Sequence, residues 1–343
     1  MISLLDRVLG CLYGIAIGDA MGMPTSFLTP EEIQQRYGWV DTFYDPKDGH
    51  IYHQGLRAGE VTDDTEQSLA LVRSFVRNKK VVPPDIVSEL FKWAERVKHK
   101  YVSPLGPSTE RSFKLLKNGG NIHETGVLGD TNGSGMRIAP LGIIHGLRKS
   151  DDRDLISDVY LTCLPTHNTT VAIAAAGAIA KAIALSMEGV SNMDQIILQT
   201  RQVAEEATKF GAVVAGASIS KRIELAKEIV QKNNCDKSKT MRDFYDIFGG
   251  GVLAADSIPL AVGIFYLANG NVKETIEIAV NLGGDCDTIG AMAGAIAGTY
   301  SGVAQIPAAW RNTIKSKNQI DLETVAQELI GLAPQWTISS DAN

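Results

Sequence analysis

The sequence predicts an all-α fold, and three observations carry this prediction. Apolar residues recur at the three- and four-residue spacing of amphipathic helices along almost the whole chain. Runs that alternate with period two between turn dipeptides are scarce, so we expect few strands. No linker separates two zones of different composition, although the length of 343 residues would permit two domains as well as one.

The expected helices follow one another with short polar breaks. The first begins after Ser3, a residue type that caps helix N-termini well. Its apolar stripe consists of Leu4, Leu5, Val8, Leu9, Leu12 and Ile15. Similar stripes occupy residues 69–76, 86–97, 171–185, 196–207, 218–230, 258–267, 272–280, 289–299 and 322–330. The polar residues 232–239 predict a surface loop between two helices.

Two of these helices carry glycine at every fourth position. The rows are Gly10, Gly14 and Gly18 in the first helix and Gly290, Gly294 and Gly298 in a late one. Glycine inside a helix costs roughly 1 kcal/mol relative to alanine, so a row on one face needs a reason. Close approach of another backbone is one reason, and simple tolerance of small residues is the alternative. We expect these helices to lie at the centre of the fold.

Composition and charge exclude several classes of protein. With 44% apolar residues the chain can bury a sizeable core. The net charge is −6 and no Lys/Arg run is longer than a pair, which argues against sequence-independent binding of nucleic acid. The apolar N-terminal stretch is interrupted by Asp6, Arg7 and Asp19, so we expect no signal peptide.

The cysteines and the long uncharged window predict a cytoplasmic protein without a membrane span. Cys11, Cys163, Cys235 and Cys286 are scattered without zinc spacing and are typical of reduced thiols. Residues 288–310 contain no Asp, Glu, Lys or Arg and are long enough to span a bilayer. They are rich in small residues and include Pro307, which favours a close-packed helix followed by a loop.

Two acidic clusters stand before apolar helical runs, Thr62-Asp63-Asp64-Thr65 early and Asp285-Cys286-Asp287-Thr288 late. Each could simply start a helix, because Asp and Thr cap N-termini and acids complement the helix dipole. Asp63 followed by Glu66 resembles a capping box. Two acids per cluster exceed what a cap needs, however. Because neighbouring side chains on a helix diverge by roughly 100°, Asp63 and Asp64 could serve two ions, or one ion and a water.

The two clusters together would form an oxygen-rich set that suits Mg²⁺ or Mn²⁺. Gathering four carboxylates is costly without cations, and two divalent ions would neutralise them. The sequence leaves open whether the clusters meet. The second glycine row begins directly behind the late cluster and the first ends at Gly18-Asp19, which favours a meeting.

Five ordered motifs resemble the ADP-ribosylglycohydrolase family, which includes dinitrogenase-reductase-activating hydrolases and certain lens crystallins. They are GIAIGDAMGMP at 14–24, TDDT at 62–65, NGSGMRIAPLG at 132–142, PTH at 165–167 and GGDCDTIG at 283–290. The resemblance implies a compact, single-domain, all-α orthogonal bundle over residues 1–335, followed by a tail at 336–343. It also implies a cleft with two Mg²⁺ or Mn²⁺ ions. The implied activity is cleavage of an N- or O-glycosidic bond at the anomeric carbon of an ADP-ribosyl group on a protein or small molecule.

The resemblance also assigns roles to individual residues. It implies Thr62, Asp63, Asp64, Asp285, Asp287 and Thr288 as metal ligands, with Asp63, Asp64 and Asp287 as the catalytic carboxylates. It implies substrate contacts from Asn132, Gly133, Ser134, Gly135, Met136 and His167. Taken without the resemblance, the glycine-rich loop at 132–135 is typical of an ordinary turn. His167 alone is typical of a solvated residue at the start of a helix. Residues 249–251, three glycines, are compatible with a flexible cleft wall or with a helix C-cap.

One departure separates this chain from many relatives. Two residues after the proline of the first motif they carry a glutamate that is proposed to handle the metal-bound water or the substrate, whereas this chain has Ser26. A serine cannot act as a carboxylate base near neutral pH, so an aspartate takes the role or the substrate geometry differs. The alternatives are a hydrolase of a smaller N-glycoside such as a nucleoside, and a non-catalytic ADP-ribose-binding or crystallin-like protein.

Overall fold

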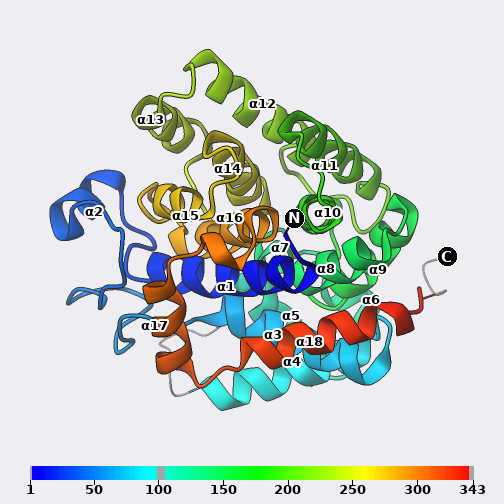
Figure 1. Cartoon of the computed structure of the whole chain (residues 1–343). Coiled ribbons are helices and arrows are strands. Elements are labelled where there is room, and N and C mark those ends of the chain that lie inside the picture. The colour runs from blue at the N-terminus through cyan, green and yellow to red at the C-terminus, as the bar shows by residue number, and fades with distance from the viewer. Residues whose placement is uncertain (1, 99–104, 340–343) are drawn as a thin grey trace.

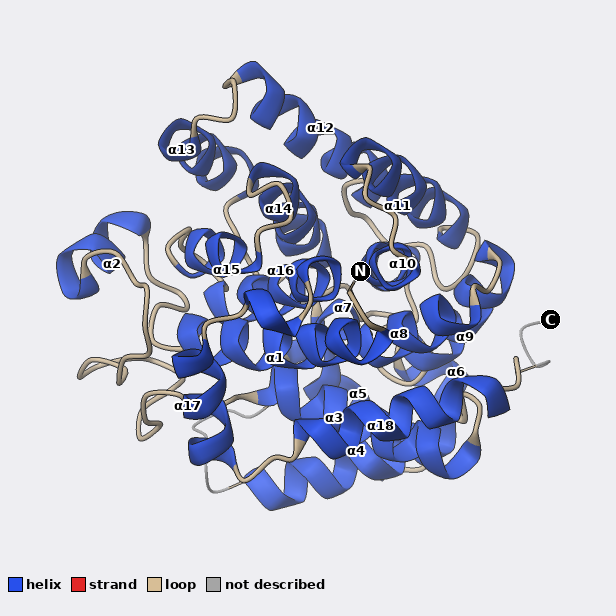
Figure 2. Cartoon of the chain, viewed as in Figure 1, coloured by secondary structure: helices blue, strands red, loops and turns tan. Residues whose placement is uncertain are grey.

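The fold is built from helices packed in several directions (Figures 1 and 2). The computed structural model describes residues 2–98 and 105–339. Within these residues there are eighteen α-helices, two short 3₁₀ helices and no strand. Three isolated β-bridges join Leu28 to Gly284, Thr131 to Leu253 and Thr169 to Ala212. The prediction of an all-α fold is therefore confirmed.

The helices have the following bounds in chain order. They are α1 (Leu4–Gly22), α2 (Pro30–Tyr37), α3 (Asp63–Asn78), α4 (Pro83–Val97), α5 (Pro107–Lys117), α6 (Ile122–Thr125), α7 (Gly133–Arg137), α8 (Ala139–Arg148), α9 (Asp152–Cys163), α10 (Thr170–Glu188), α11 (Met193–Ala207), α12 (Ile219–Lys232), α13 (Lys237–Phe248), α14 (Ala254–Leu267), α15 (Val272–Val280), α16 (Cys286–Ser301), η1 (Val303–Gln305), α17 (Ala308–Asn318), α18 (Leu322–Leu332) and η2 (Ala333–Gln335).

The predicted apolar stripes all fall in helices, and the predicted stripe at 272–280 coincides with α15. The loop predicted at 232–239 is wrong in its extent. It covers only residues 233–236, because α12 continues to Lys232 and α13 already begins at Lys237. The side chain of Asp236 accepts a hydrogen bond from the backbone N–H of Lys239 and so caps α13.

Helices α1 and α16 form the antiparallel centre of the fold, as Figure 1 shows. The glycine rows face each other: Gly10 lies against Gly298, Gly14 against Gly294 and Gly18 against Gly290. A Cβ atom added to Gly14 would lie 2.0 Å from the carbonyl oxygen of Gly294, so no larger residue fits without moving the backbone. The expected close backbone approach is confirmed, and it accounts for the cost of these glycines.

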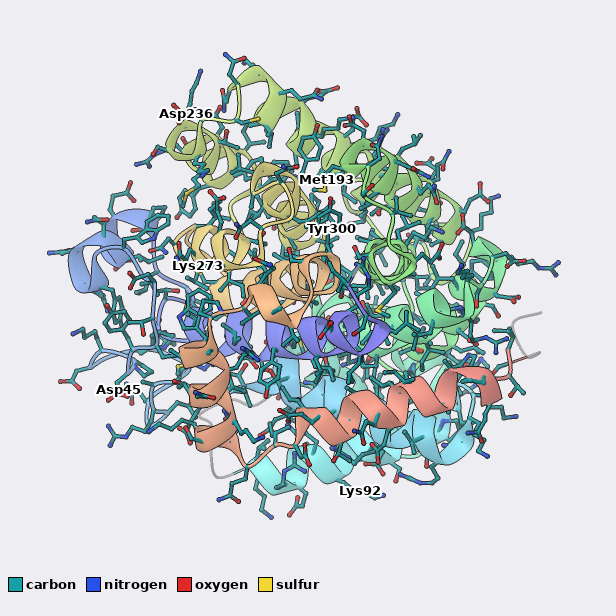
Figure 3. All side chains as sticks on the ribbon, viewed as in Figure 1. Asp45, Lys92, Met193, Asp236, Lys273 and Tyr300 are labelled. Carbon is teal, nitrogen blue, oxygen red and sulfur yellow. The ribbon has the colours of Figure 1, made fainter. Side chains whose placement is uncertain are left out.

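The most apolar helix is α10. By length and composition it is the one described helix that could cross a membrane, but 89% of that window is buried inside the fold. It packs against α8, α9, α11 and α16, which explains its apolar surface on all sides. Charged side chains such as Lys92 and Lys273 lie instead on the outside of the molecule (Figure 3).

The last described residues pack onto the helices. Trp336 is buried, its ring stands edge-on to Phe75, and its Nε1–H donates to Asp158 at 2.8 Å. The Ser339 hydroxyl donates to the carbonyl of Val81 at 2.9 Å. Of the tail predicted at 336–343, residues 340–343 lie outside the described part of the chain.

Candidate active site

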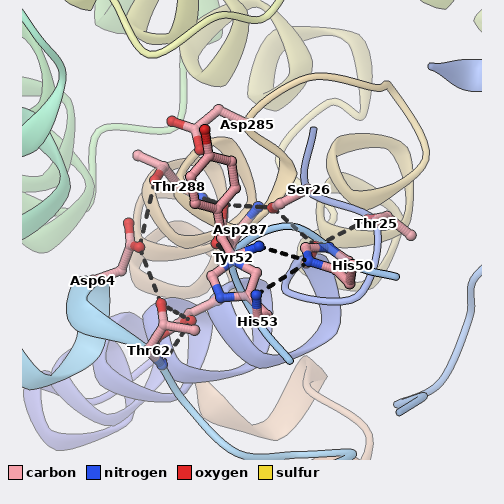
Figure 4. A network of polar contacts seen from close by, with 12 residues as sticks. Thr25, Ser26, His50, Tyr52, His53, Thr62, Asp64, Asp285, Asp287 and Thr288 are labelled. Atoms are coloured by element: carbon pink, nitrogen blue, oxygen red, sulfur yellow. Dashed lines mark hydrogen bonds and ion pairs between the residues drawn. The ribbon is translucent and has the colours of Figure 1, made fainter. Parts of the chain in front are cut away.

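The two acidic clusters meet at the N-terminal ends of α3 and α16. Thr62 and Asp285 are the N-cap residues, and neither side chain makes a capping hydrogen bond to its helix. Instead the hydroxyls of Thr62 and Thr288 both donate to Asp64 Oδ2 at 3.4 Å, and Thr288 comes from 224 positions away in the chain (Figure 4). The capping-box interpretation of the early cluster is therefore replaced by contacts between the clusters.

A buried aspartate that the sequence interpretation missed holds the early cluster in place. Asp19, near the end of α1, is fully buried and accepts hydrogen bonds from the backbone N–H and the hydroxyl of both Thr62 and Thr65. Burial raises its pKa to about 6, although these threonine contacts act against the rise. The one sequence signal that could have revealed it is an acid on an otherwise apolar helix face.

Asp287 has a polar partner at each of its two carboxylate oxygens. Its Oδ1 accepts from the Ser26 hydroxyl at 2.6 Å and from the Thr288 N–H at 2.9 Å, and its Oδ2 lies 3.0 Å from His53 Nε2 (Figure 4). Burial alone would raise its pKa, but the hydrogen bonds and charge of His53 together with Ser26 lower the pKa to about 2. His53 lies in a loop without a recognisable motif, so no sequence signal pointed to it.

The pKa values of the other acids are raised because like charges are buried close together. Burial, followed by the nearby charges of Asp287 and Asp19, raises the pKa of Asp63 to about 7. Burial and the neighbouring carboxylates also raise the pKa values of Asp64 and Asp285 well above their ordinary range. The cluster therefore holds more negative charge than the protein itself compensates.

The chemistry of this donor set fits a hard divalent cation. The donors are carboxylate and hydroxyl oxygens, and Asp64 Oδ1 is buried without a hydrogen-bond partner. Across residues 2–98 and 105–339, however, no three His, Cys, Asp or Glu side chains are already grouped as a metal site requires. The two-ion centre therefore stays a prediction.

The cluster opens into a cavity of about 430 Å³. Of the predicted site residues, Asp63, Asp285, Asp287, Thr288, Asn132, Gly133 and Met136 line it. Phe27, which follows α1, and Tyr52 and His53, which lie in the loop before α3, also line the cavity. Residues 105–107, 109 and 110 near the start of α5 complete this part of the wall. Thr62 and Asp64 lie in the layer behind this wall, where Thr62 is 1% and Asp64 1% exposed.

The glycine-rich loop is placed at the acid cluster by Asn132. Its side-chain amide donates to Asp285 Oδ2 at 2.6 Å, and its N–H donates to the carbonyl of Val252 at 2.9 Å. Ser134 is buried and donates to the carbonyl of Ala172, and Gly135 packs under Ile258. These last two residues therefore support the loop from behind.

His167 also lies behind the loop and is fully buried. Its Nε2 is 3.1 Å from the Thr131 hydroxyl, its Nδ1 is 2.8 Å from the Thr166 hydroxyl, and burial lowers its pKa well below the ordinary value. A Cβ atom on Gly133 would lie 3.0 Å from this ring, so a larger residue there would press on His167. The predicted ligand contact of His167 stays a prediction, and the structure places Gly133 between the ring and the cavity.

A buried arginine connects the same loop to Asp63. Arg137 is 1% exposed and donates to Gln67 Oε1 at 2.7 Å and to Thr166 Oγ1 at 2.5 Å. The Gln67 amide in turn donates to Asp63 Oδ2 at 3.2 Å. Burial lowers the pKa of Arg137 to about 10, so the side chain remains a cation at neutral pH. Gln67 and Arg137 thus orient Asp63, a role that their positions in the sequence did not reveal.

The triple-glycine segment confirms the helix C-cap interpretation, and its backbone contacts the late acid cluster. Gly249 ends α13 in a left-handed conformation with φ of 75°. The carbonyl of Gly250 accepts a hydrogen bond from the Asp285 N–H at 2.7 Å, and Val252 lines the cavity. The segment is a helix end whose backbone positions the late acid cluster.

Comparison with known proteins agrees with this geometry. The family described as ADP-ribosylglycohydrolase matches residues 1–338. The chain is 34% identical to the uncharacterized protein YegU of Escherichia coli, over 94% of this chain and 96% of that protein. It is 27% identical to the ADP-ribosyl-[dinitrogen reductase] glycohydrolase of Rhodospirillum rubrum, over 96% and 98% of the two chains.

A solved structure shows the same fold. It is titled an ADP-ribosylglycohydrolase-related protein complex, and it superposes with a TM-score of 0.69 at 22% identity, covering 96% of this chain and 99% of that one. The match over nearly the whole sequence, together with the helix-end acids around one cavity, shows that the chain belongs to the ADP-ribosylglycohydrolase family.

Proposed function

We propose that this protein is a divalent-metal-dependent hydrolase that cleaves the glycosidic bond at the anomeric carbon of an ADP-ribosyl group. The observation that carries the proposal is the meeting of two acidic helix ends on one cavity wall, where Thr288 contacts Asp64. Membership in the family supports the ADP-ribosyl part of the proposal. The R. rubrum relative carries such an activity in its name.

Two Mg²⁺ or Mn²⁺ ions would be held by Thr62, Asp63, Asp64, Asp285, Asp287 and Thr288. When bound, such ions neutralise the carboxylates, hold substrate hydroxyls and make a water molecule more acidic. Other residues of the chain hold these ligands in position. Asn132 fixes the Asp285 carboxylate, and Asp19 fixes the backbone of Thr62 and Thr65.

Asp63 is the carboxylate best placed to accept a proton from water in the cavity. It lines the cavity, and the Gln67 amide holds its Oδ2. Asp287 is less suited, because both of its oxygens already accept hydrogen bonds or face His53. Ser26 occupies the usual glutamate position and serves as a hydrogen-bond partner of Asp287 rather than as a base.

The proposal is tested by incubating the protein and Mg²⁺ with ADP-ribosyl-arginine, ADP-ribosyl-serine and a panel of nucleosides. Release of ADP-ribose that disappears in EDTA and in the Asp63→Asn variant supports it. The matched control is Asp41→Asn, which alters an exposed aspartate that does not line the cavity. Turnover of nucleosides alone identifies the smaller-glycoside alternative, and binding of ADP-ribose without turnover of any substrate identifies the non-catalytic one.

A further inference from the structure

Two aromatic rings form part of the cavity wall at the end where Asp287 lies. Phe27 and Tyr52 both line the cavity, with ring centroids 4.5 Å apart and ring planes inclined by 53°. Each is the sequence neighbour of a residue that contacts Asp287, Ser26 for the first ring and His53 for the second. Figure 4 shows Tyr52 together with these contacts. The rings are thereby tied to the part of the cavity that holds Asp287.

The fold keeps the Phe27 ring on this wall at a conformational cost. Phe27 has a φ of 64°, a left-handed backbone conformation that is uncommon and unfavourable for a bulky residue. Its N–H donates to the carbonyl of Gly284 at 2.6 Å, and the Gly284 N–H donates to the carbonyl of Leu28 at 3.0 Å. The ring is still 40% exposed and Tyr52 is 39% exposed. Strain that leaves an apolar ring open to a cavity points to a ligand contact.

The charges around the rings restrict what can stack on them. Among the described lining residues, Asp63, Glu110, Asp285 and Asp287 are acidic, His53 is the one basic side chain, and Lys and Arg do not contribute. The faces of aromatic rings also carry partial negative charge. The ring faces therefore favour a planar group that is neutral or cationic over an anionic one.

We propose that Phe27 and Tyr52 form a stacking platform for a planar nitrogen heterocycle, the leaving group of an N-ribosyl substrate. This rests on the proposed function, since it takes Asp287 to lie beside the reacting bond. In the reaction the bond from the anomeric carbon to the ring nitrogen breaks, and its electron pair stays on that nitrogen. The oxygen of water bonds to the anomeric carbon and the water proton passes to solvent. A pyridinium ring leaves as a neutral base and needs no proton.

The test compares a substrate with a planar leaving group and one without. NAD⁺, an ADP-ribosyl pyridinium, and an ADP-ribosyl-serine peptide are assayed with wild type, Phe27→Leu, Tyr52→Leu and the control Trp39→Leu, which removes an exposed aromatic ring outside this cavity. We expect each platform variant to lower kcat/KM for NAD⁺ about tenfold, in line with the loss of one stacking contact. The loss on the serine substrate should be clearly smaller than the loss on NAD⁺, and the Trp39 variant should leave both rates unchanged. Equal losses on both substrates, or no loss on NAD⁺, overturn the platform.

A binding measurement separates this inference from the proposed function. Free nicotinamide is added to the wild-type protein, and contact is followed by saturation-transfer NMR. If no substrate is hydrolysed but a nicotinamide signal is present and is lost in Phe27→Leu and in Tyr52→Leu, the platform stands while the hydrolase proposal fails. Absence of the signal in wild type, or its persistence in both variants with unchanged melting temperatures, overturns the platform.

Discussion

Ser26 and Asp287 hold each other through two hydrogen bonds across 261 positions of the chain. The Ser26 hydroxyl donates to Asp287 Oδ1 at 2.6 Å and accepts from the Asp287 N–H at 3.0 Å. The turn after α1 and the first turn of α16 are thus joined at the acid cluster. This pair explains how a serine is accommodated where relatives carry a glutamate.

Replacing Ser26 by glutamate should lower the hydrolysis rate. The side chain is buried and 1% exposed, so a carboxylate there would be forced against Asp287 and would repel it. General-base catalysis typically raises a rate about 10²–10⁴-fold. If the site lacked only this base, Ser26→Glu would therefore raise the hydrolysis rate strongly. The measurement is the rate of wild type, Ser26→Glu and the control Ser26→Ala across a pH series on the best substrate. A clear gain for Ser26→Glu would identify the chain as a weakened ADP-ribosylhydrolase and refute this expectation.

Metal titration should show two divalent ions bound per chain. The uncompensated acids and the orphaned Asp64 Oδ1 provide the physical reason. Calorimetry with Mg²⁺ and with Mn²⁺ on EDTA-treated protein is the measurement, and Asp285→Ala should abolish binding of at least one ion. The exposed Asp41→Asn serves as control. The two-ion prediction is wrong if less than one ion binds per chain, or if Asp285→Ala leaves metal binding unaffected.

Gly294→Leu should destabilise the fold strongly and weaken metal binding with it. A Cβ atom at this position would lie 2.3 Å from the carbonyl oxygen of Gly14, so α1 and α16 must move apart. Overpacking of this kind typically lowers the free energy of unfolding by about 1–3 kcal/mol. We expect a value at the upper end of this range, because the clash is with backbone atoms. The control is Gly331→Ala, where an added Cβ atom meets nothing within 4 Å. Thermal unfolding should show a clear drop for the first and none for the second, and an unchanged midpoint for Gly294→Leu would make the row incidental.

Glu89 should contribute stability that depends on pH. It is 4% exposed and contacts Arg73 at 3.0 Å, Arg77 at 2.7 Å and Lys92 at 2.8 Å. Burial would raise its pKa, but the bonds from Lys92 and Arg73 outweigh burial and lower the pKa below its ordinary value. A lowered folded-state pKa stabilises the protein above the unfolded value, and this contribution is lost as the pH falls through the folded value.

The variant Glu89→Gln should therefore lose about 1–3 kcal/mol of unfolding free energy at pH 7, in line with hydrogen bonds to charged groups. The difference from wild type should shrink as the pH is lowered below about 4. Denaturant unfolding at several pH values is the measurement. The control Glu95→Gln in the same helix breaks an exposed ion pair with Lys98 and should change little. A difference that is constant with pH would assign the loss at Glu89 to packing.

The sequence predicted the parts of the site that have a repeating or local signal. The glycine rows predicted the contact of α1 with α16, because only backbone contact justifies six interior glycines. The paired acids at Asp63 and Asp285 predicted a charged cluster for a similar reason. His53 and Gln67 were missed, because a loop histidine and a helix glutamine gain their meaning only from residues brought near by folding.

The contact of α1 with α16 also has a consequence for biosynthesis. Gly10 contacts Gly298, so α1 leaves the ribosome long before its partner α16 has been made. At about 5–20 residues per second this delay is on the order of tens of seconds. During that time the apolar face of α1 is uncovered, and the active site does not exist in any shorter nascent chain. A stalled or truncated product that lacks α16 is therefore an inactive, aggregation-prone species and a natural client of chaperones that shield nascent apolar helices.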